Sequence, residues 1–188
     1  MTEGKVKRKR IIKIGENEKE LIKIIGLGLL TVGIVAAAIA LPGLPMALKP
    51  FLKRGQKNFR KEVKKLKKKG VIYLGPDEIK LTKRGKELLK LIEISEIKIE
   101  PPKKWDKLWR LVSYDVPKTK NKERDWFRRL LINLEFTKIQ DSLWAFPYEC
   151  AQEVSVIAQS LGISPYVVLM QARTVPGEKK ILERYYLN

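Results

Sequence analysis

Apolar and polar positions between residues 58 and 70 recur at helical spacing. An apolar residue stands at every third or fourth position among lysines, at Phe59, Val63 and Leu66. This pattern predicts an amphipathic helix with a narrow apolar stripe and a wide basic face. Asn58 is the expected N-cap, and Gly70 is the expected stop.

Upstream, the pattern changes to a continuous apolar run. Residues 24–48 contain no charged side chain. We expect a helix that Asn17 caps, that begins near Glu18 and that runs toward Leu41, after which prolines end it. A short second helix is expected around residues 46–53.

Downstream, the basic helix is followed by two short β-prone runs. They flank Gly75-Pro76-Asp77, a turn sequence, and therefore predict a β-hairpin. A further amphipathic helix is expected in LTKRGKELLKLIEI, residues 81–94, with three apolar residues facing inward: Leu88, Leu89 and Ile92.

Beyond Pro101-Pro102 the order of elements is different. The sequence LWRLVSYDV predicts a buried strand, and the following helix should place Trp126, Leu130, Leu131 and Leu134 on one side. One or two strands, a second helix that ends at Gly162, and a final strand follow. The order β-α-β-β-α-β predicts a ferredoxin-like sandwich, so the fold class is α+β.

These patterns divide the chain into four segments. Residues 1–15 form a basic arm, and 16–95 form a helical module with a hairpin. Residues 96–104 are a linker, and 105–188 form the ferredoxin-like domain.

Charge narrows the choice of partner. The chain has 40 Lys and Arg against 21 Asp and Glu, a net charge of +19. Residues 1–100 hold 25 of the basic and 11 of the acidic side chains. Such an excess predicts a polyanion partner, either nucleic acid or an anionic membrane surface.

The lack of histidine and the single cysteine exclude several kinds of catalytic and metal site. Because the sequence has no histidine, His-based acid–base catalysis and His-ligated zinc are excluded. A single cysteine, Cys150, excludes an internal disulfide framework and favours a reducing, cytoplasmic compartment.

The segment from Lys53 to Lys69 is the most basic part of the chain, with ten basic residues and one acid. A solvated helix face is the plain alternative, but a partner nucleic acid would use this charge for salt-dependent phosphate binding. Near the start of the helix, Gln56, Asn58 and Arg60 are the candidates for reading base edges. The candidate phosphate contacts are Lys57, Lys61, Lys64, Lys65, Lys67, Lys68, Lys69 and, on the hairpin, Lys80.

The apolar run 24–48 has two interpretations. It is long enough to span a bilayer. Alternatively, it packs beneath the basic helix and meets a second protomer, since its glycines and alanines allow close helix approach.

The stretch VKKLKKKGVIYLGPDEIKLTKRGKELL resembles the recognition helix, wing and exit of the winged helix-turn-helix family. The resemblance covers about residues 18–92. It implies that the basic helix and the hairpin bind duplex DNA.

The second half of the chain resembles the central domain of the phenylacetate-degradation repressor family, PaaX. The matching motifs are W-D-x-x-W-R-L-V from Trp105, aromatic-Asp-x-Pro from Tyr114, and Trp-x-x-Pro from Trp144. That family places this domain behind a winged helix. The resemblance implies a transcriptional repressor that needs no cofactor for DNA binding.

The same domain is similar to the small CRISPR-associated spacer-acquisition endonuclease. Its strand-end aspartate corresponds to Asp115, and in that family two protomers are proposed to hold a divalent metal between them. The resemblance implies that Asp115 is a catalytic residue and an Mg²⁺ ligand. The alternative is structural, because an acid at a strand end commonly receives N–H groups of the next loop. Asp125 and Asp141 are the nearby acids, and neither is a convincing second ligand.

The sequence therefore predicts a homodimeric DNA-binding transcriptional regulator rather than an enzyme. The alternative is a metal-dependent nuclease or CRISPR adaptation protein that acts through Asp115. A third interpretation is a nucleic-acid binder tethered to a membrane by residues 24–48.

Overall fold

The computed structural model of the chain describes residues 14–27, 56–75 and 79–187. The chain divides into two compact units, residues 1–92 and 93–188. Each unit mixes helices with a β-sheet, so the α+β class is confirmed. Most of the apolar run 24–48, and the short helix expected at 46–53, lie outside the described residues.

Helix α1 (Glu16–Gly26) is the first described element. Its N-cap is Gly15, not Asn17, because the Glu18 carboxylate reaches back to accept the Gly15 N–H at 2.9 Å. The helix ends at Gly26 and does not continue as one helix toward Leu41, since Leu27 already forms its C-cap. The prediction missed the cap because a side chain inside the helix, rather than one before it, satisfies the end.

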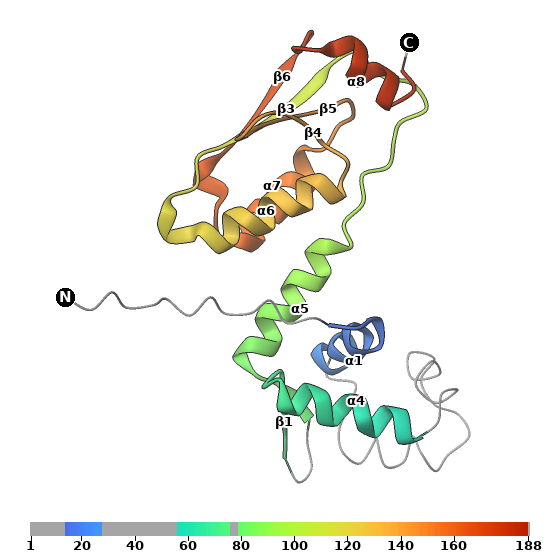
Figure 1. Ribbon diagram of the computed structural model, residues 1–188, viewed down its shortest axis with the longest axis vertical. Coiled ribbons are helices and arrows are strands. Elements are labelled where there is room, and N and C mark those ends of the chain that lie inside the picture. The colour runs from blue at the N-terminus through green and yellow to red at the C-terminus, as the bar shows by residue number, and fades with distance from the viewer. Residues whose placement is uncertain (1–13, 28–55, 76–78, 188) are drawn as a thin grey trace, which may run out of the picture. The chain divides into compact units, whose positions relative to one another are not determined.

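The remaining elements of the first unit are helix α4 (Gln56–Lys68), strands β1 (Ile72–Leu74) and β2 (Ile79–Leu81), and helix α5 (Lys83–Ser95) (Figure 1). Helix α4 begins at Gln56, so Asn58 lies within its first turn and is not its N-cap. The two strands pair antiparallel, which confirms the predicted hairpin. The core of the unit joins α1, α4, the hairpin and α5 through buried residues that include Leu21, Ile22, Leu66, Val71 and Ile92.

Backbone contacts connect the end of α4 to the hairpin and to α5. Gly70 adopts φ +66°, and the hydrogen bonds Gly70 N–H to Lys67 O and Val71 N–H to Leu66 O close the helix. The carbonyl of Val71 then accepts the N–H of Thr82 at 3.0 Å. Gly85 has no room for a side chain, because a Cβ there would overlap the Val71 carbonyl oxygen.

The second unit follows the order β-α-β-β-α-β and ends in a further helix. Its elements are β3 (Trp109–Tyr114), α6 (Asn121–Asn133), β4 (Thr137–Gln140), β5 (Leu143–Phe146), α7 (Ala151–Leu161), β6 (Val167–Ala172) and α8 (Glu178–Arg184). The strands form one antiparallel sheet in the order β4-β5-β3-β6. The sequence did not predict α8, a short helix of mostly charged residues.

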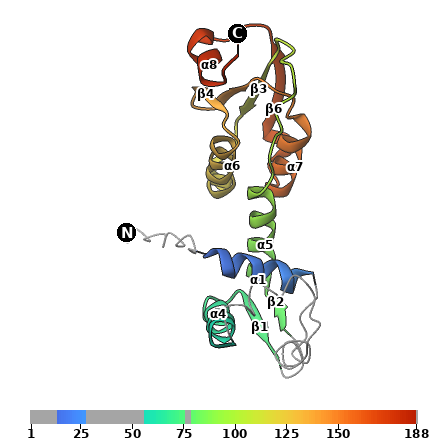
Figure 2. The same ribbon diagram turned by 90° about the vertical axis from the view of Figure 1, so that its right-hand side faces the viewer.

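Helices α6 and α7 lie side by side on one face of this sheet (Figures 1 and 2). Tyr114 points to that face, where its ring meets Phe127 of α6 edge-on at 5.3 Å. Trp126, which was expected on the same side of the helix as Leu130, is partly buried, whereas its neighbour Phe127, for which no burial was predicted, is fully buried. Helix α7 ends as predicted at Gly162, which adopts φ +66°.

The opposite face of the sheet is only partly covered. Helix α8 packs Ile181 onto Trp109 and Ala145, and Trp109 Nε1 donates to Glu178 at 2.6 Å. Farther along the same face, successive rows across the sheet join Leu143, Ser113 and Val168, and then Ala145, Leu111 and Met170. Val168 is 54% exposed and Met170 is 42% exposed, so this end of the face stays open.

Candidate nucleic-acid interface

The outer face of α4 carries a row of lysines. Val63 and Leu66 are buried on the inner side of the helix, as the sequence predicted. Lys61, Lys64 and Lys68 are exposed and follow one another at i, i+3 and i+7, which places them on one stripe. The stripe therefore points away from the core, toward any partner that reaches this helix.

Two other lysines of this segment have acidic partners. Lys65 Nζ lies 2.8 Å from Glu62 Oε1, one turn back on the same helix, and this hydrogen bond raises the pKa of Lys65. Lys69 Nζ lies 2.6 and 2.8 Å from the two carboxylate oxygens of Glu18. Lys69 therefore connects the end of α4 to α1, a role that the sequence did not indicate.

Glu18 is a buried carboxyl group, at 5% exposure. Burial alone would raise the pKa of this carboxyl group. The hydrogen bond from Gly15 and the contacts with Lys69 outweigh burial, so the pKa of Glu18 is lowered. Glu18 thus holds the start of α1 and the end of α4 together through one charged group.

The hairpin adds a second exposed surface to the first unit. Lys80 is exposed on β2, and its cross-strand neighbour Tyr73 is 57% exposed on β1. The structure does not describe the side chains of residues 56–60, so the positions of Gln56, Lys57, Asn58 and Arg60 remain predictions.

The lysine stripe has the chemistry of a phosphate-binding surface. Lys61, Lys64, Lys67 and Lys68 are exposed, and none of them forms an ion pair with another described residue. Ammonium groups without a carboxylate partner can replace the counterions of a polyanion backbone, which makes binding strong and salt-dependent.

Asp115 follows β3 directly in the second unit. Its side chain is exposed, and its backbone N–H donates to the carbonyl of Tyr166 at 2.9 Å. Its carboxylate forms no ion pair with any other described side chain. The backbone of Asp115 is therefore used by the fold, while the carboxylate remains open to solvent.

The neighbouring acids do not complete a metal site with Asp115 in one chain. Asp141 pairs with Lys138 at 2.6 Å, and that hydrogen bond lowers the pKa of Asp141. Asp125 lies 3.9 Å from Arg128. Over the described ranges, no three acidic or cysteine side chains gather closely enough to hold a metal ion. One Asp115 can supply one Mg²⁺ ligand, so a full site needs a further carboxylate or a substrate oxygen.

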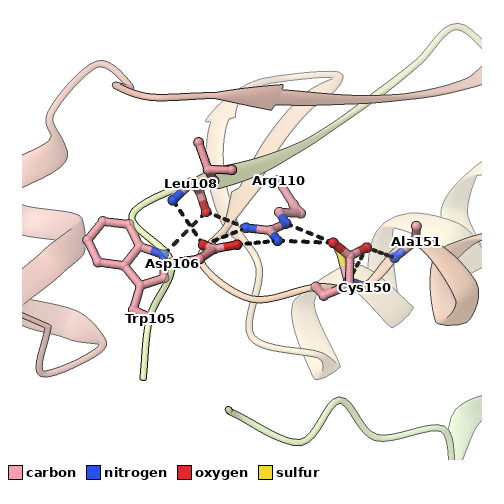
Figure 3. A network of polar contacts seen from close by, with 7 residues as sticks. Trp105, Asp106, Leu108, Arg110, Cys150 and Ala151 are labelled. Carbon is pink, nitrogen blue, oxygen red and sulfur yellow. Dashed lines mark hydrogen bonds and ion pairs between the residues drawn. The ribbon is translucent and has the colours of Figure 1, made fainter. Parts of the chain in front are cut away.

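An ionic network fixes the start of β3 (Figure 3). The Arg110 guanidinium, in a residue only 8% exposed, lies 2.6 Å from Asp106 Oδ2 and 3.0 Å from Glu149 Oε2. It also donates to the carbonyl of Leu108 at 2.8 Å, and the same carbonyl accepts the Trp105 indole N–H at 3.2 Å. The tight turn puts Lys107 at φ +62°, a conformation that non-glycine residues rarely adopt.

Each charge of this network is stabilised by its partners. The hydrogen bond to Asp106 raises the pKa of Arg110, and the same bond lowers the pKa of Asp106. Glu149 has a lowered pKa because it accepts the backbone N–H of Ala151, and the nearby Arg110 lowers it further. The network therefore connects the end of the linker to the first turn of α7.

Cys150 lies beside this network and is fully buried. Burial raises the pKa of its thiol to about 12. Because the thiolate is the reactive form, Cys150 is a packing residue at neutral pH and not a nucleophile.

None of the helices formed by the described residues combines the length and the apolar character that crossing a bilayer requires. The apolar run 24–48 lies mostly outside those residues, so its two interpretations stay open.

Comparison with known families finds a match within the second unit. Residues 102–181 match the family model of the PaaX protein central Cas2-like domain. A search of the curated proteins found no match to the chain.

Proposed function

Residues 102–181 match the family model of the PaaX central Cas2-like domain, and from this premise we propose that the chain is a DNA-binding transcriptional regulator of that family. Members of the PaaX family are DNA-binding regulators. We interpret the first unit as a winged helix-turn-helix, with α4 as the recognition helix and the β1–β2 hairpin as the wing. Its order of helix, basic helix, hairpin and closing helix supports this interpretation.

The observation that carries the proposal is the lysine stripe of α4. The core-facing side of this helix is apolar, and its outer side has three exposed lysines in line, Lys61, Lys64 and Lys68. We expect these lysines, with Lys65, Lys67 and Lys80, to contact phosphates, which position a protein without reading sequence. The base readers that we propose are Gln56, Asn58 and Arg60, in the first turns of α4.

The experiment replaces Lys61, Lys64 and Lys68 together by glutamine and measures binding to duplex DNA over a series of salt concentrations. If each lysine contacts one phosphate, the slope of log K against log salt falls by about 2.7, or about 0.9 for each contact. A matched control replaces Lys83, Lys86 and Lys90 on the exposed side of α5 by glutamine, with the same change in net charge.

A regulator must also select a sequence. We expect a footprint with repeated or palindromic half-sites, because a dimer reads two half-sites related by its two-fold axis. Uniform coating of any duplex would reduce the proposal to generic binding. Equal salt slopes for the α4 and α5 variants would contradict the role of the stripe.

We also propose that the second unit is a ferredoxin-like domain that forms a homodimer through its open sheet face. The support is an uncharged, partly exposed surface made of Leu111, Ser113, Leu143, Val168 and Met170. In a chain with a net charge of +19, an uncharged face is where two copies can meet without repulsion.

Replacement of Val168 by glutamate tests the dimer. The change places a charge on the open face, at its β6 edge, so we expect a monomer in multi-angle light scattering. Gln171→Glu on the other face of the same strand is the control and should leave the dimer intact. A parent chain that is monomeric at micromolar concentration would refute the proposal.

A metal-dependent nuclease is the second candidate, because the exposed Asp115 carboxylate has no ion-pair partner among the described residues. The test incubates the chain with single-stranded RNA and with duplex DNA in Mg²⁺ or Mn²⁺. Cleavage that Asp115→Ala abolishes and Asp141→Ala preserves would establish this function. If the parent chain cleaves neither substrate, the nuclease function is rejected and the transcriptional regulator remains the proposed function. We expect this regulator to act in the cytoplasm.

A further inference from the structure

The excess charge of the second half of the chain is concentrated in one short segment. Residues 101–188 contain 15 basic and 10 acidic side chains, an excess of five. Residues 118–129 alone contain six basic and two acidic side chains, an excess of four. The rest of this half is therefore close to neutral, and the basic charge lies around the start and the middle of α6.

The structure places much of this charge on the outer side of α6. Phe127 and Leu130 face the core, whereas Lys122 and Arg129 are exposed. The Arg129 guanidinium lies over the Trp126 ring, 5.8 Å from its centroid, which holds the cation flat against the helix surface. Neither Lys122 nor Arg129 forms an ion pair within the described ranges.

Helix α7, next to α6, presents a face without charge. Its exposed positions are all neutral: Ala151, Gln152, Ser155, Val156 and Gln159. The one carboxylate of α7, Glu153, is partly buried in its first turn, so the fully exposed positions of this helix hold no carboxylate against the α6 cations. Lys120 Nζ donates to the Gly162 carbonyl at 2.7 Å, which ties the start of α6 to the end of α7.

We propose that this helical layer, α6 with α7, is a second contact for the phosphate backbone of duplex DNA. The proposal rests on the DNA-binding function proposed for the first unit. Lys122 and Arg129 supply the charge, and the amide and hydroxyl groups of Gln152, Ser155 and Gln159 supply neutral donors of the kind that contact phosphate oxygens. Once α4 holds a duplex, the second contact is intramolecular, so two modest charges add measurably to affinity.

The experiment compares three full-length proteins on the same duplex over a series of salt concentrations. The first is the parent, and the second is the double variant Lys122→Gln and Arg129→Gln. The third is the matched control Lys179→Gln and Lys180→Gln, which removes the same charge from exposed positions on α8. The expected result is a salt slope that falls by about 1.8 in the α6 variant, because two phosphate contacts are lost. The control should keep the slope of the parent.

Two results would overturn the inference. One is an α6 variant whose salt slope equals that of the α8 control. Lys122 and Arg129 would then affect DNA binding only through the net charge of the chain and not through phosphate contacts. The other is a parent that binds no duplex, which would also end the proposed function. If the α4 variant loses binding while the α6 variant does not, only the second contact fails. If the α6 variant alone loses binding, the second contact stands and the role of α4 fails.

Discussion

Cationic side chains serve opposite purposes in the two units of this protein. On α4 of the first unit, Lys61, Lys64 and Lys68 are exposed and lack carboxylate partners within the described residues. In the second unit, Arg110 is buried and contacts two carboxylates and a backbone carbonyl. A cation that is fully satisfied by its own chain stabilises the fold, whereas a cation left in water is available to a partner. We therefore expect loss of a buried cation to lower stability, and loss of an exposed α4 lysine to weaken DNA binding instead.

Replacement of Arg110 by methionine should produce the largest loss of stability. The change removes the hydrogen bonds that Arg110 donates to Asp106, Glu149 and the Leu108 carbonyl, and breaking a buried ion pair costs about 3 kcal/mol or more. Glu149 is itself 62% exposed at its side chain and can take up water, so we expect the lower end of that range. All four tryptophans lie in the second unit, so tryptophan fluorescence in urea follows its unfolding.

Arg128→Met is the control for Arg110→Met. Arg128 is exposed and lies 3.9 Å from Asp125, so its loss should change the free energy of unfolding by less than about 0.5 kcal/mol. Equal losses in the two variants would break the contrast between buried and exposed cations.

Replacement of Glu18 by glutamine should produce the next largest effect. The variant weakens both the cap of α1 and the contact with Lys69, and charge-assisted hydrogen bonds of this kind contribute about 1.5–3 kcal/mol. Hydrogen exchange of the α1 amides measures the loss. Glu16→Gln, at an exposed position of the same helix turn, should protect those amides as the parent does. If Glu18→Gln also leaves the amides fully protected, the contact between Lys69 and Glu18 does not stabilise the fold. Lys69 would then be counted with the exposed lysines of the α4 stripe.

Acid should weaken both units in the same pH window. The pKa values of Glu18, Asp106 and Glu149 are lowered in the folded chain, so the unfolded chain binds protons more readily than the folded one. Their stabilisation is present above the unfolded values of about 4 and is lost as the pH falls through the lower, folded values. Urea midpoints measured from pH 6 to pH 3 should fall, and Glu149→Gln should reduce the number of protons taken up on unfolding. An unchanged pH dependence in that variant would show that Glu149 is not ionised by its neighbours.

Replacement of one stripe lysine, such as Lys64 by glutamine, should have the smallest effect on stability. Its side chain is exposed, so the free energy of unfolding should change by less than about 0.5 kcal/mol. The salt slope for duplex DNA should fall by about 0.9, the value for one phosphate contact. A stability loss comparable to that of Arg110→Met would place Lys64 among the structural cations.

The sequence predicted those features that depend on local periodicity. The Val63 and Leu66 stripe, the hairpin, and the helix stop at Gly162 each follow from a few neighbouring residues. The Arg110 network was not predicted, because Glu149 lies 39 residues away in the chain and only the fold brings it near. Its partial signal was the i, i+4 spacing of Asp106 and Arg110 within the W-D-x-x-W-R motif.

The errors of prediction also have physical causes. Trp126 and Phe127 are adjacent aromatics, and only the packing of α6 on the sheet decides which of them is buried. Helix α8 has too few apolar residues for a periodic signal, and it is held by Ile181 and by the Trp109–Glu178 hydrogen bond. For the lysines, exposure could be predicted, but the pairing of Lys69 with Glu18 across 51 residues could not.

The main chain of Val71 has a consequence for how this protein can change. Its N–H closes the end of α4, its carbonyl receives Thr82, and the backbone of Gly85 lies directly against it. Main-chain hydrogen bonds and the Thr82 hydroxyl, which donates to the carbonyls of Gly70 and Val71, therefore fix the spacing between helix and hairpin. Surface lysines can be exchanged, added or lost without altering that spacing, so the strength of phosphate binding can change while the geometry of the helix and hairpin stays constant.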